Sequence, residues 1–156
     1  MSCMSRAYDT IRRKVILNLL NDAGSTEDEI RIVNLLLTNT KLTIRINKTK
    51  SEKFETTLGS FQGDALSGKL FTLYLAGALN HLRATIERPN PPIGIDLLPM
   101  ETEYVDDCDF IDESKEKLEE LPPQVEKVFN EWNLKVSPNK TEFTDIYVSE
   151  DAKKKR

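Results

Sequence analysis

The sequence has no long hydrophobic run and few cysteines. None of its apolar stretches approaches the roughly 18 residues that a membrane span needs, and no signal-peptide pattern opens the chain. Cys3 and Cys108 are too few for a disulfide framework and indicate a reducing compartment. Internal repeats and low-complexity segments are also absent. We therefore expect an intracellular protein of the cytoplasm or nucleus, without membrane contact, that forms one globular domain or a piece of one.

An excess of positive charge is missing as well. The net charge of −4 argues against a simple basic nucleic-acid binder. The charge is uneven along the chain, because residues 1–50 carry +4 and residues 101–156 carry −7. A basic N-terminal part and an acidic C-terminal part suit a site that binds phosphates on one side and metals on the other. The same asymmetry is also compatible with chance.

The front of the chain shows helical periodicity. Apolar residues recur at three- and four-residue steps over residues 10–21, which predicts a helix that ends at Gly24. Thr26 and Glu29 have the spacing of a capping box, which predicts a second helix that reaches about Asn39.

Alternation replaces helical periodicity in residues 41–47, where Leu42, Ile44 and Ile46 share one face. This pattern predicts a half-buried strand, and residues 54–59 are its expected hairpin partner. The hairpin carries five basic residues. They are Lys41, Arg45, Lys48, Lys50 and Lys53. A solvated face and a surface that contacts a nucleic-acid backbone explain them equally well.

A glycine-rich loop over residues 59–68 precedes a long helix. Ser67 is the expected N-cap, and the helix extends to about Ile86. Its wide apolar stripe makes it the expected centre of the core. The stripe consists of Leu70, Phe71, Tyr74, Leu75, Ala78, Leu79 and Leu82. His81 lies in this helix, and we assign it no role.

The back of the chain starts with a proline-rich loop, residues 89–99. Pro122-Pro123 suits a helix start, and the amphipathic helix that follows ends near Asn133. Residues 134–140 then predict a strand and a turn, and residues 141–149 a last strand.

The stretch Tyr104-Val105-Asp106-Asp107 lies between these parts and organises the chain. Strand-forming residues flank its two adjacent carboxylates on both sides. A tight hairpin turn would let both carboxylates reach one pocket, where hard divalent cations such as Mg²⁺ bind. The alternative is an acidic, solvated turn. A calcium loop is excluded, because the glycine of its sharp turn is missing.

The predicted strands are segregated from the helices along the chain. This order indicates an α+β fold, an antiparallel sheet with helices packed on one face.

Four sequence blocks together carry a family resemblance. They are SRAYDTI (5–11), GSFQGDALSGKLF (59–71), YVDD (104–107) and LKVSPNKTEF (134–143). In this order and spacing they resemble the palm region of a reverse transcriptase, most closely those of non-LTR retrotransposons. The resemblance implies a ferredoxin/RRM-like polymerase palm that works with an RNA template, a DNA primer and dNTPs.

The resemblance also implies a two-metal site. Asp106 and Asp107 match the family's metal-binding pair, which holds two Mg²⁺ ions for nucleotidyl transfer. Lys140 matches a lysine near the pyrophosphate leaving group, where a cation or proton donor offsets developing charge. The alternative for Lys140 is an exposed turn lysine.

Three further residues match substrate-binding positions. Tyr8 matches the aromatic residue that selects deoxynucleotides by blocking a 2′-hydroxyl, although core packing would also explain it. Gln62 and Gly63 match the loop beside the incoming nucleotide and template.

One departure from the family pattern concerns the third carboxylate. The first block of the family has an aspartate four residues before the position of Ala7, and here that residue is Cys3. A thiol is a poor ligand for Mg²⁺, and Asp9 lies six residues further on and cannot replace it. Weak or absent Mg²⁺ binding is therefore expected, and the chain by itself is expected not to polymerise. Three prolines of the second block are also replaced, by Phe61, Ala65 and Gly68.

The expected domain is a partial palm over residues 1–149, followed by a charged tail, residues 150–156. Fingers and thumb segments would come from a longer polyprotein. The alternative is a non-catalytic remnant of the palm fold that acts as a nucleic-acid- or protein-binding module.

Overall fold

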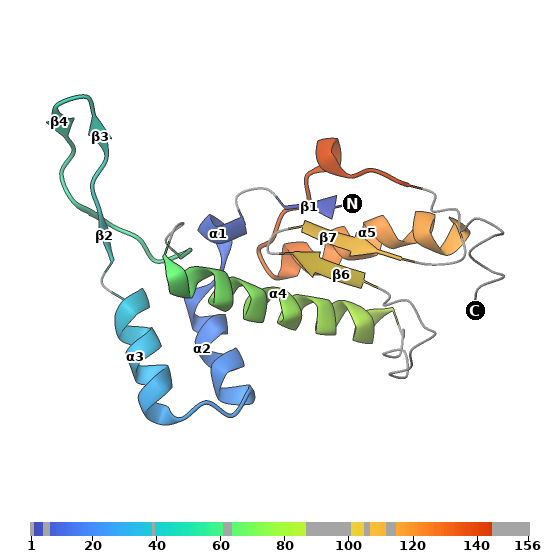
Figure 1. Cartoon of the computed structure of the whole chain (residues 1–156), viewed down its shortest axis with the longest axis horizontal. Coiled ribbons are helices and arrows are strands. Elements are labelled where there is room, and N and C mark those ends of the chain that lie inside the picture. The colour runs from blue at the N-terminus through green and yellow to red at the C-terminus, as the bar shows by residue number, and fades with distance from the viewer. Residues whose placement is uncertain are drawn as a thin grey trace, which may run out of the picture.

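The computed structural model describes residues 2–4, 7–38, 40–60, 64–86, 101–104, 107–111 and 115–144. Figure 1 shows the arrangement of their helices and strands. In chain order these are β1 (Ser2–Cys3), α1 (Ala7–Thr10), α2 (Arg13–Asp22), α3 (Glu27–Leu37), β2 (Lys41–Leu42), β3 (Arg45–Ile46), β4 (Thr49–Lys50), β5 (Phe54–Glu55), α4 (Ala65–Thr85), β6 (Glu101–Tyr104), β7 (Asp107–Phe110), α5 (Lys115–Glu131) and the 3₁₀ helix η1 (Pro138–Lys140).

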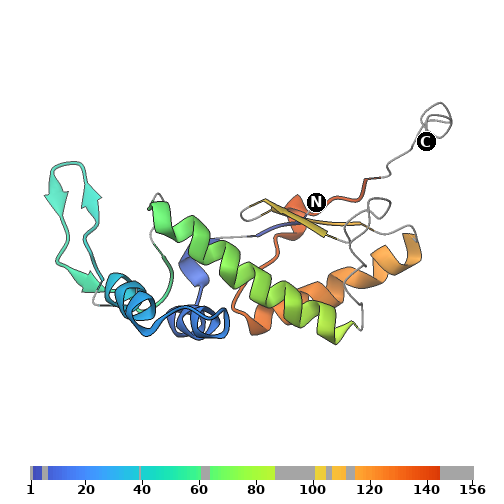
Figure 2. The ribbon, with the colours of Figure 1, turned by 60° about the horizontal axis from the view of Figure 1, so that its bottom comes forward.

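Three strands form an antiparallel sheet in the order β1-β7-β6. Met4 adds an isolated antiparallel bridge to Val136, so the chain after α5 lies beside the chain that leaves β1. Figure 2 shows α4 and α5 together on one face of this sheet. The predicted α+β architecture, with helices on one face of an antiparallel sheet, is therefore confirmed.

The long helix α4 is the centre of the core, as predicted. All seven positions of its apolar stripe are buried, and they pack with Val125, Val128 and Phe129 of α5. The N-cap is Asp64 and not Ser67, because the Asp64 carboxylate accepts a hydrogen bond from the Leu66 N–H. The helix therefore begins earlier than predicted, and Ser67 lies buried inside it.

The first predicted helix, residues 10–21, corresponds to α2, which begins at Arg13; the short helix α1 precedes it, and Ile11 and Arg12 lie between the two. The Ile11 side chain is fully buried. Gly24 adopts a left-handed φ of 81° after α2, which confirms the predicted stop. The capping box of Thr26 and Glu29 is present at the start of α3. That helix ends at Leu37, and Asn39 lies outside the described residues.

The prediction that α5 starts at the proline pair was wrong. Pro122 and Pro123 lie inside α5. Each proline removes a backbone donor from a helix interior, which costs about 3 kcal/mol. The helix persists because its apolar positions, Leu121 and Val125 among them, are buried against the rest of the core.

The hairpin of residues 41–55 forms, but it is exposed and not half-buried. Its strands are short, and Lys41 pairs with Glu55 and Arg45 with Lys50. Ile44 and Ile46 are 54% and 68% exposed, because the hairpin extends away from the described helices and sheet (Figure 1). The alternation in the sequence predicted the strands correctly and the buried face wrongly.

The strand predicted for residues 134–140 is reduced to the single bridge at Val136, followed by η1. Residues 141–144 form no strand, and residues 145–149 lie outside the described residues, as does the proline-rich loop 89–99. Among the described helices, none combines the length and the apolar composition that a membrane span requires.

Candidate active site at the β6–β7 hairpin

The YVDD stretch forms the predicted tight hairpin. Tyr104, the last residue of β6, pairs with Asp107, the first residue of β7. Only Val105 and Asp106 remain between the two strands, and both lie outside the described residues. The register alone therefore requires a two-residue connection with Asp106 in it.

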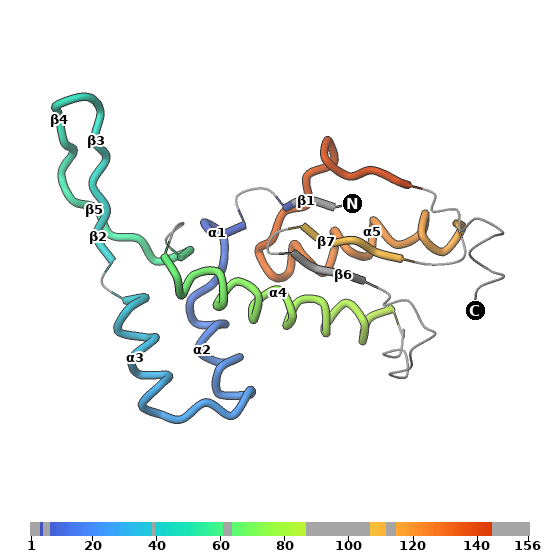
Figure 3. The backbone as a smooth tube through the Cα atoms, viewed as in Figure 1, coloured from blue at the N-terminus to red at the C-terminus, as the bar shows by residue number. Residues whose placement is uncertain are grey.

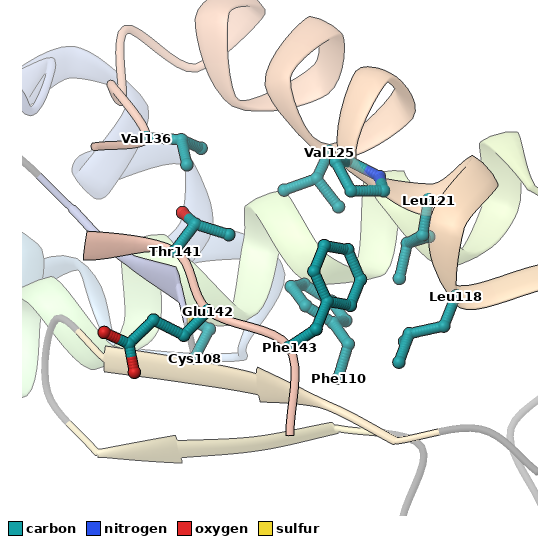
Figure 4. Close-up of a pocket in the computed structure, with 10 residues that line it drawn as sticks. Cys108, Phe110, Leu118, Leu121, Val125, Val136, Thr141, Glu142 and Phe143 are labelled. Carbon is teal, nitrogen blue, oxygen red and sulfur yellow. The ribbon is translucent and has the colours of Figure 1, made fainter. Parts of the chain in front are cut away.

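Asp107 lies on the face of the sheet that the helices leave open. In β7 the buried Cys108 and the half-buried Phe110 alternate with Asp107 and the exposed Asp109. Successive residues of a strand point to opposite faces, and Cys108 and Phe110 face the helices (Figure 4). A substrate could thus approach the Asp107 side of β7 without displacing a helix.

The chain's beginning lies next to this hairpin. β1 pairs with β7 so that Cys3 is directly opposite Asp107 and Ser2 is opposite Cys108. The next residue, Met4, bridges to Val136 in the fourth block. The chain just before residues 5–11, which includes the position of the first-block aspartate of the family, therefore meets the third and fourth blocks at one corner of the sheet.

The second block packs on the first through the backbone. The N–H groups of Gly59 and Ser60 donate to the carbonyl oxygens of Ile11 and Tyr8, both at 2.9 Å. Gly59 has a φ of 78°, and a Cβ there would lie 2.9 Å from the carbonyl oxygens of Tyr8 and Asp9. Glycine is thus required on both grounds.

Tyr8 packs on α4. Its ring lies 5.0 Å from the ring of Phe71, centroid to centroid, and it is half-buried. This contact agrees with the packing role and does not test the selection of deoxynucleotides. Gln62 and Gly63 lie outside the described residues.

Lys140 is the last residue of η1 and is exposed. η1 lies beside β1, which brings the fourth block to the same edge of the sheet as Cys3. Its exposure agrees with the alternative of a turn lysine. In a catalytic role, Lys140 would have to reach from η1 across β1 to the β6–β7 hairpin.

One comparison with known proteins identifies a family. The family model for reverse transcriptase (RNA-dependent DNA polymerase) matches residues 4–154, nearly the whole chain. The chain belongs to the reverse transcriptase family. A search of the curated proteins finds no match to it.

Sequence reasoning missed Arg13, which holds several parts of this reverse transcriptase chain together. Its guanidinium donates to the carbonyl oxygens of Leu37 (2.7 Å), Thr56 (2.6 Å), Leu58 (3.0 Å) and Gly59 (2.8 Å), and to the hydroxyls of Thr40 and Thr56. Burial lowers the pKa of Arg13 from its ordinary value. One signal was available: a cation at the start of a helix opposes the helix dipole, so it needs a partner elsewhere.

His81 also has a structural partner that its sequence did not reveal. Nε1 of Trp132 donates to Nδ1 of His81 at 3.0 Å, and the Tyr74 hydroxyl donates to the Trp132 carbonyl oxygen at 2.5 Å. A Cβ at Gly77 would lie 2.8 Å from the Trp132 ring. These contacts join α4 to the end of α5, away from the hairpin.

The described residues of the reverse transcriptase chain include no group of three His, Cys, Asp or Glu side chains that could hold a metal ion. A cavity of about 70 Å³ lies between β7, α5 and residues 141–143 (Figure 4). It is lined largely by apolar side chains such as Phe110, Leu121 and Val125. It therefore lies on the face of β7 opposite Asp107, and the carboxylate in its lining is that of Glu142.

Proposed function

We propose that this chain is the palm region of a non-LTR-type reverse transcriptase, with its metal site at Asp106 and Asp107. The observation that carries the proposal is the pairing of Cys3 with Asp107, because it brings the first and third family blocks together. We propose that the palm covers residues 1–149 and that residues 150–156 are a charged tail; the family match itself spans residues 4–154. Fingers and thumb come from other parts of a polyprotein that acts in the cytoplasm or nucleus.

The remaining site residues have roles around this pair. Gln62 and Gly63 lie beside the incoming dNTP and the template, and Tyr8 excludes the 2′-hydroxyl. Lys140 offsets charge on the leaving pyrophosphate. The backbone bonds between Ser60 and Tyr8 support a shared nucleotide pocket, because they hold the loop before Gln62 against the first block.

The donor set does not fit two Mg²⁺ ions. In the family, the metals activate the primer 3′-hydroxyl and bind the triphosphate. Position 3 is directly opposite Asp107, which is where a third carboxylate would complete the set. A soft, neutral thiol is a poor substitute for a hard oxygen ligand. We therefore propose that the chain binds divalent metals weakly and supports little or no RNA-templated DNA synthesis by itself.

Restoring the carboxylate tests this proposal. The Cys3→Asp variant should bind Mn²⁺ at least about tenfold more tightly than the parent in isothermal titration calorimetry, because a third hard ligand joins the pair. Cys3→Ser is the matched control, since it removes the thiol without adding a carboxylate, and Asp106→Asn in the restored background should abolish the gain. Equal Mn²⁺ affinity in parent and Cys3→Asp would show that the first block is wrongly aligned.

Primer extension on an RNA template is the second measurement. We expect no templated product from the parent with Mg²⁺ or Mn²⁺. Templated extension by the parent chain would contradict the proposed loss of activity while leaving the family assignment in place.

The exposed basic hairpin favours a second candidate function, a non-catalytic nucleic-acid-binding module. Lys48 and Lys50 lie at its exposed end, where phosphates could reach them. Replacing both by Ala should weaken binding of single-stranded RNA and reduce its salt dependence, as measured by fluorescence anisotropy. Lys127→Ala/Lys135→Ala is the matched control, with two exposed lysines removed elsewhere. Equal losses in both double variants would rule out a specific role for the hairpin.

A further inference from the structure

α3 carries apolar side chains on two opposite sides. Val33 and Leu37 pack against the core, whereas Ile32, Leu35 and Leu36 are 57%, 67% and 56% exposed. These three residues, which we call the α3 stripe, have the i, i+3, i+4 spacing of one helix face. Large apolar side chains that gather on an exposed face are typical of a surface that meets a partner. In the part of the chain that the structure describes, the stripe is left open to solvent.

The helix pair that carries the stripe has ends of opposite charge. α2 and α3 lie side by side (Figure 3), and Arg13 of α2 donates to the carbonyl oxygen of Leu37, so the start of α2 meets the end of α3. Exposed cations gather at this end, and they are Arg12, Lys14 and Lys41. Exposed anions gather at the other end, and they are Asp22, Glu27, Asp28 and Glu29.

Two of these charges already have partners in the chain. Asp28 pairs with Arg31 at 3.9 Å, and Lys41 pairs with Glu55 at 3.6 Å. All four side chains are more than half exposed. Exposed pairs of this kind are worth little, so they can exchange partners when another charged surface approaches.

We propose that the α3 stripe is a homodimer interface, on which a second copy of this chain docks with its α3 antiparallel to the first. A two-fold axis through the centre of the stripe reverses the direction of the helix. It therefore sets the acidic end of each copy against the basic end of the other, while the two stripes cover each other.

The charge pattern favours a second copy over other occupants. A uniformly acidic partner, including a nucleic acid, would be attracted to the end with Lys41 and repelled from the end with Asp28. A copy of the same helix pair matches both ends at once. Asp28 belongs to this contact, because it precedes Ile32 by four residues and Leu35 by seven, which is the same helix face.

The size of the surface sets the expected affinity. α3 has 11 residues and is therefore about 16 Å long. One helix face of this length is small for a stable interface, so the dimer should dissociate with a constant on the order of 10 µM. The association should weaken in high salt, because the end-to-end charges are exposed.

Sedimentation equilibrium of the full chain over a range of concentrations tests the proposal without metal or nucleotide. The parent should show a monomer–dimer equilibrium. Leu35→Glu should weaken it at least about tenfold, because it sets two carboxylates against each other in the apolar centre. Ile46→Glu is the matched control, since Ile46 is as exposed as Leu35 but lies on the hairpin, and it should leave the equilibrium unchanged.

A charge exchange tests the antiparallel arrangement. Asp28→Lys should weaken the dimer severalfold, and adding Lys41→Glu in the same chain should restore much of the loss, because the two ends then complement each other with reversed signs. A circular dichroism spectrum shows for each variant that the helices are intact.

Three results would overturn the proposal. The parent could be monomeric up to millimolar concentration, as expected if the stripe receives another segment of a longer polypeptide. Leu35→Glu and Ile46→Glu could weaken association equally, which would indicate non-specific contact. Asp28→Lys and its double variant could behave alike, which would exclude the two-fold arrangement of the ends.

Discussion

Two regions of the molecule differ in how far they bury their apolar side chains. The first region is the β1-β7-β6 sheet with α4 and α5. The second region is the α2–α3 pair with the hairpin of residues 41–55. In the first region, residues such as Phe71, Phe129 and Cys108 are almost completely buried between helices and sheet. In the second region, Leu35 and Ile46 are about two-thirds exposed. A surface of this kind is typical of proteins that meet a partner. The comparison teaches that the first region buries its large apolar side chains within the chain, whereas the second leaves several of them at the surface.

The largest effect is expected from cavities in the closed region. Phe71→Ala removes a fully buried ring next to Tyr8 and should lower the free energy of unfolding by about 3–5 kcal/mol. Leu35→Ala should change it by less than about 0.5 kcal/mol in the monomer. Urea denaturation at low protein concentration measures both. Equal losses of unfolding free energy in the two variants would contradict the difference between the regions, because Leu35 would then have to be buried in the monomer.

An intermediate effect is expected at Arg13, which holds α2 to the end of α3 and to the chain on either side of the hairpin. Arg13→Ala leaves the carbonyl oxygens of Leu37 and Gly59 without their donor, which should cost about 1–3 kcal/mol. The hydrogen exchange of residues 40–60 should rise, while that of β7 should stay unchanged.

Arg12→Ala is the control, because that side chain is exposed. Arg13→Lys should recover little, since a single ammonium cannot reproduce the fork of the guanidinium. If exchange rises in β7 as much as in the hairpin, the two regions are one cooperative unit and the comparison fails.

The smallest effect is expected at the exposed capping box of α3. The hydrogen bonds from the backbone and then from the hydroxyl of Thr26 lower the pKa of Glu29. A lowered carboxylate pKa stabilises the fold above the ordinary glutamate range, and this stabilisation is lost as the pH falls through the lowered pKa. Glu29→Gln should therefore melt slightly below the parent at neutral pH and match it in acid. Thermal scans at both pH values check this, and a constant difference would exclude the titration of Glu29.

The features that follow from local spacing could be predicted from the sequence. The buried stripe of α4, the capping box and the Gly24 stop depend on residues within a few positions of one another. The two-residue hairpin at Asp106 was predictable for the same reason. The proline pair led to a wrong start for α5. The prolines disfavour a helix locally, but the burial of Leu121 and Val125 stabilises it.

The features that depend on distant partners could not be predicted from local pattern. Alternation in residues 41–47 indicates a strand but cannot say what covers it, so Ile46 was wrongly expected to be buried. The hydrogen bonds of Arg13 join residues more than 20 positions away in sequence. The pairing of Cys3 with Asp107 joins residues about a hundred positions apart, and neither composition nor periodicity indicates it.

The strand β1 has a consequence for the order of assembly. It pairs with β7 across about a hundred residues, whereas α2 and α3 follow each other directly. Closing so large a loop is entropically costly, so contacts between neighbours in sequence should form sooner. A nascent chain would thus form the α2–α3 pair and the basic hairpin first. The pairing of β1 with β7, which places Cys3 opposite Asp107, would form last.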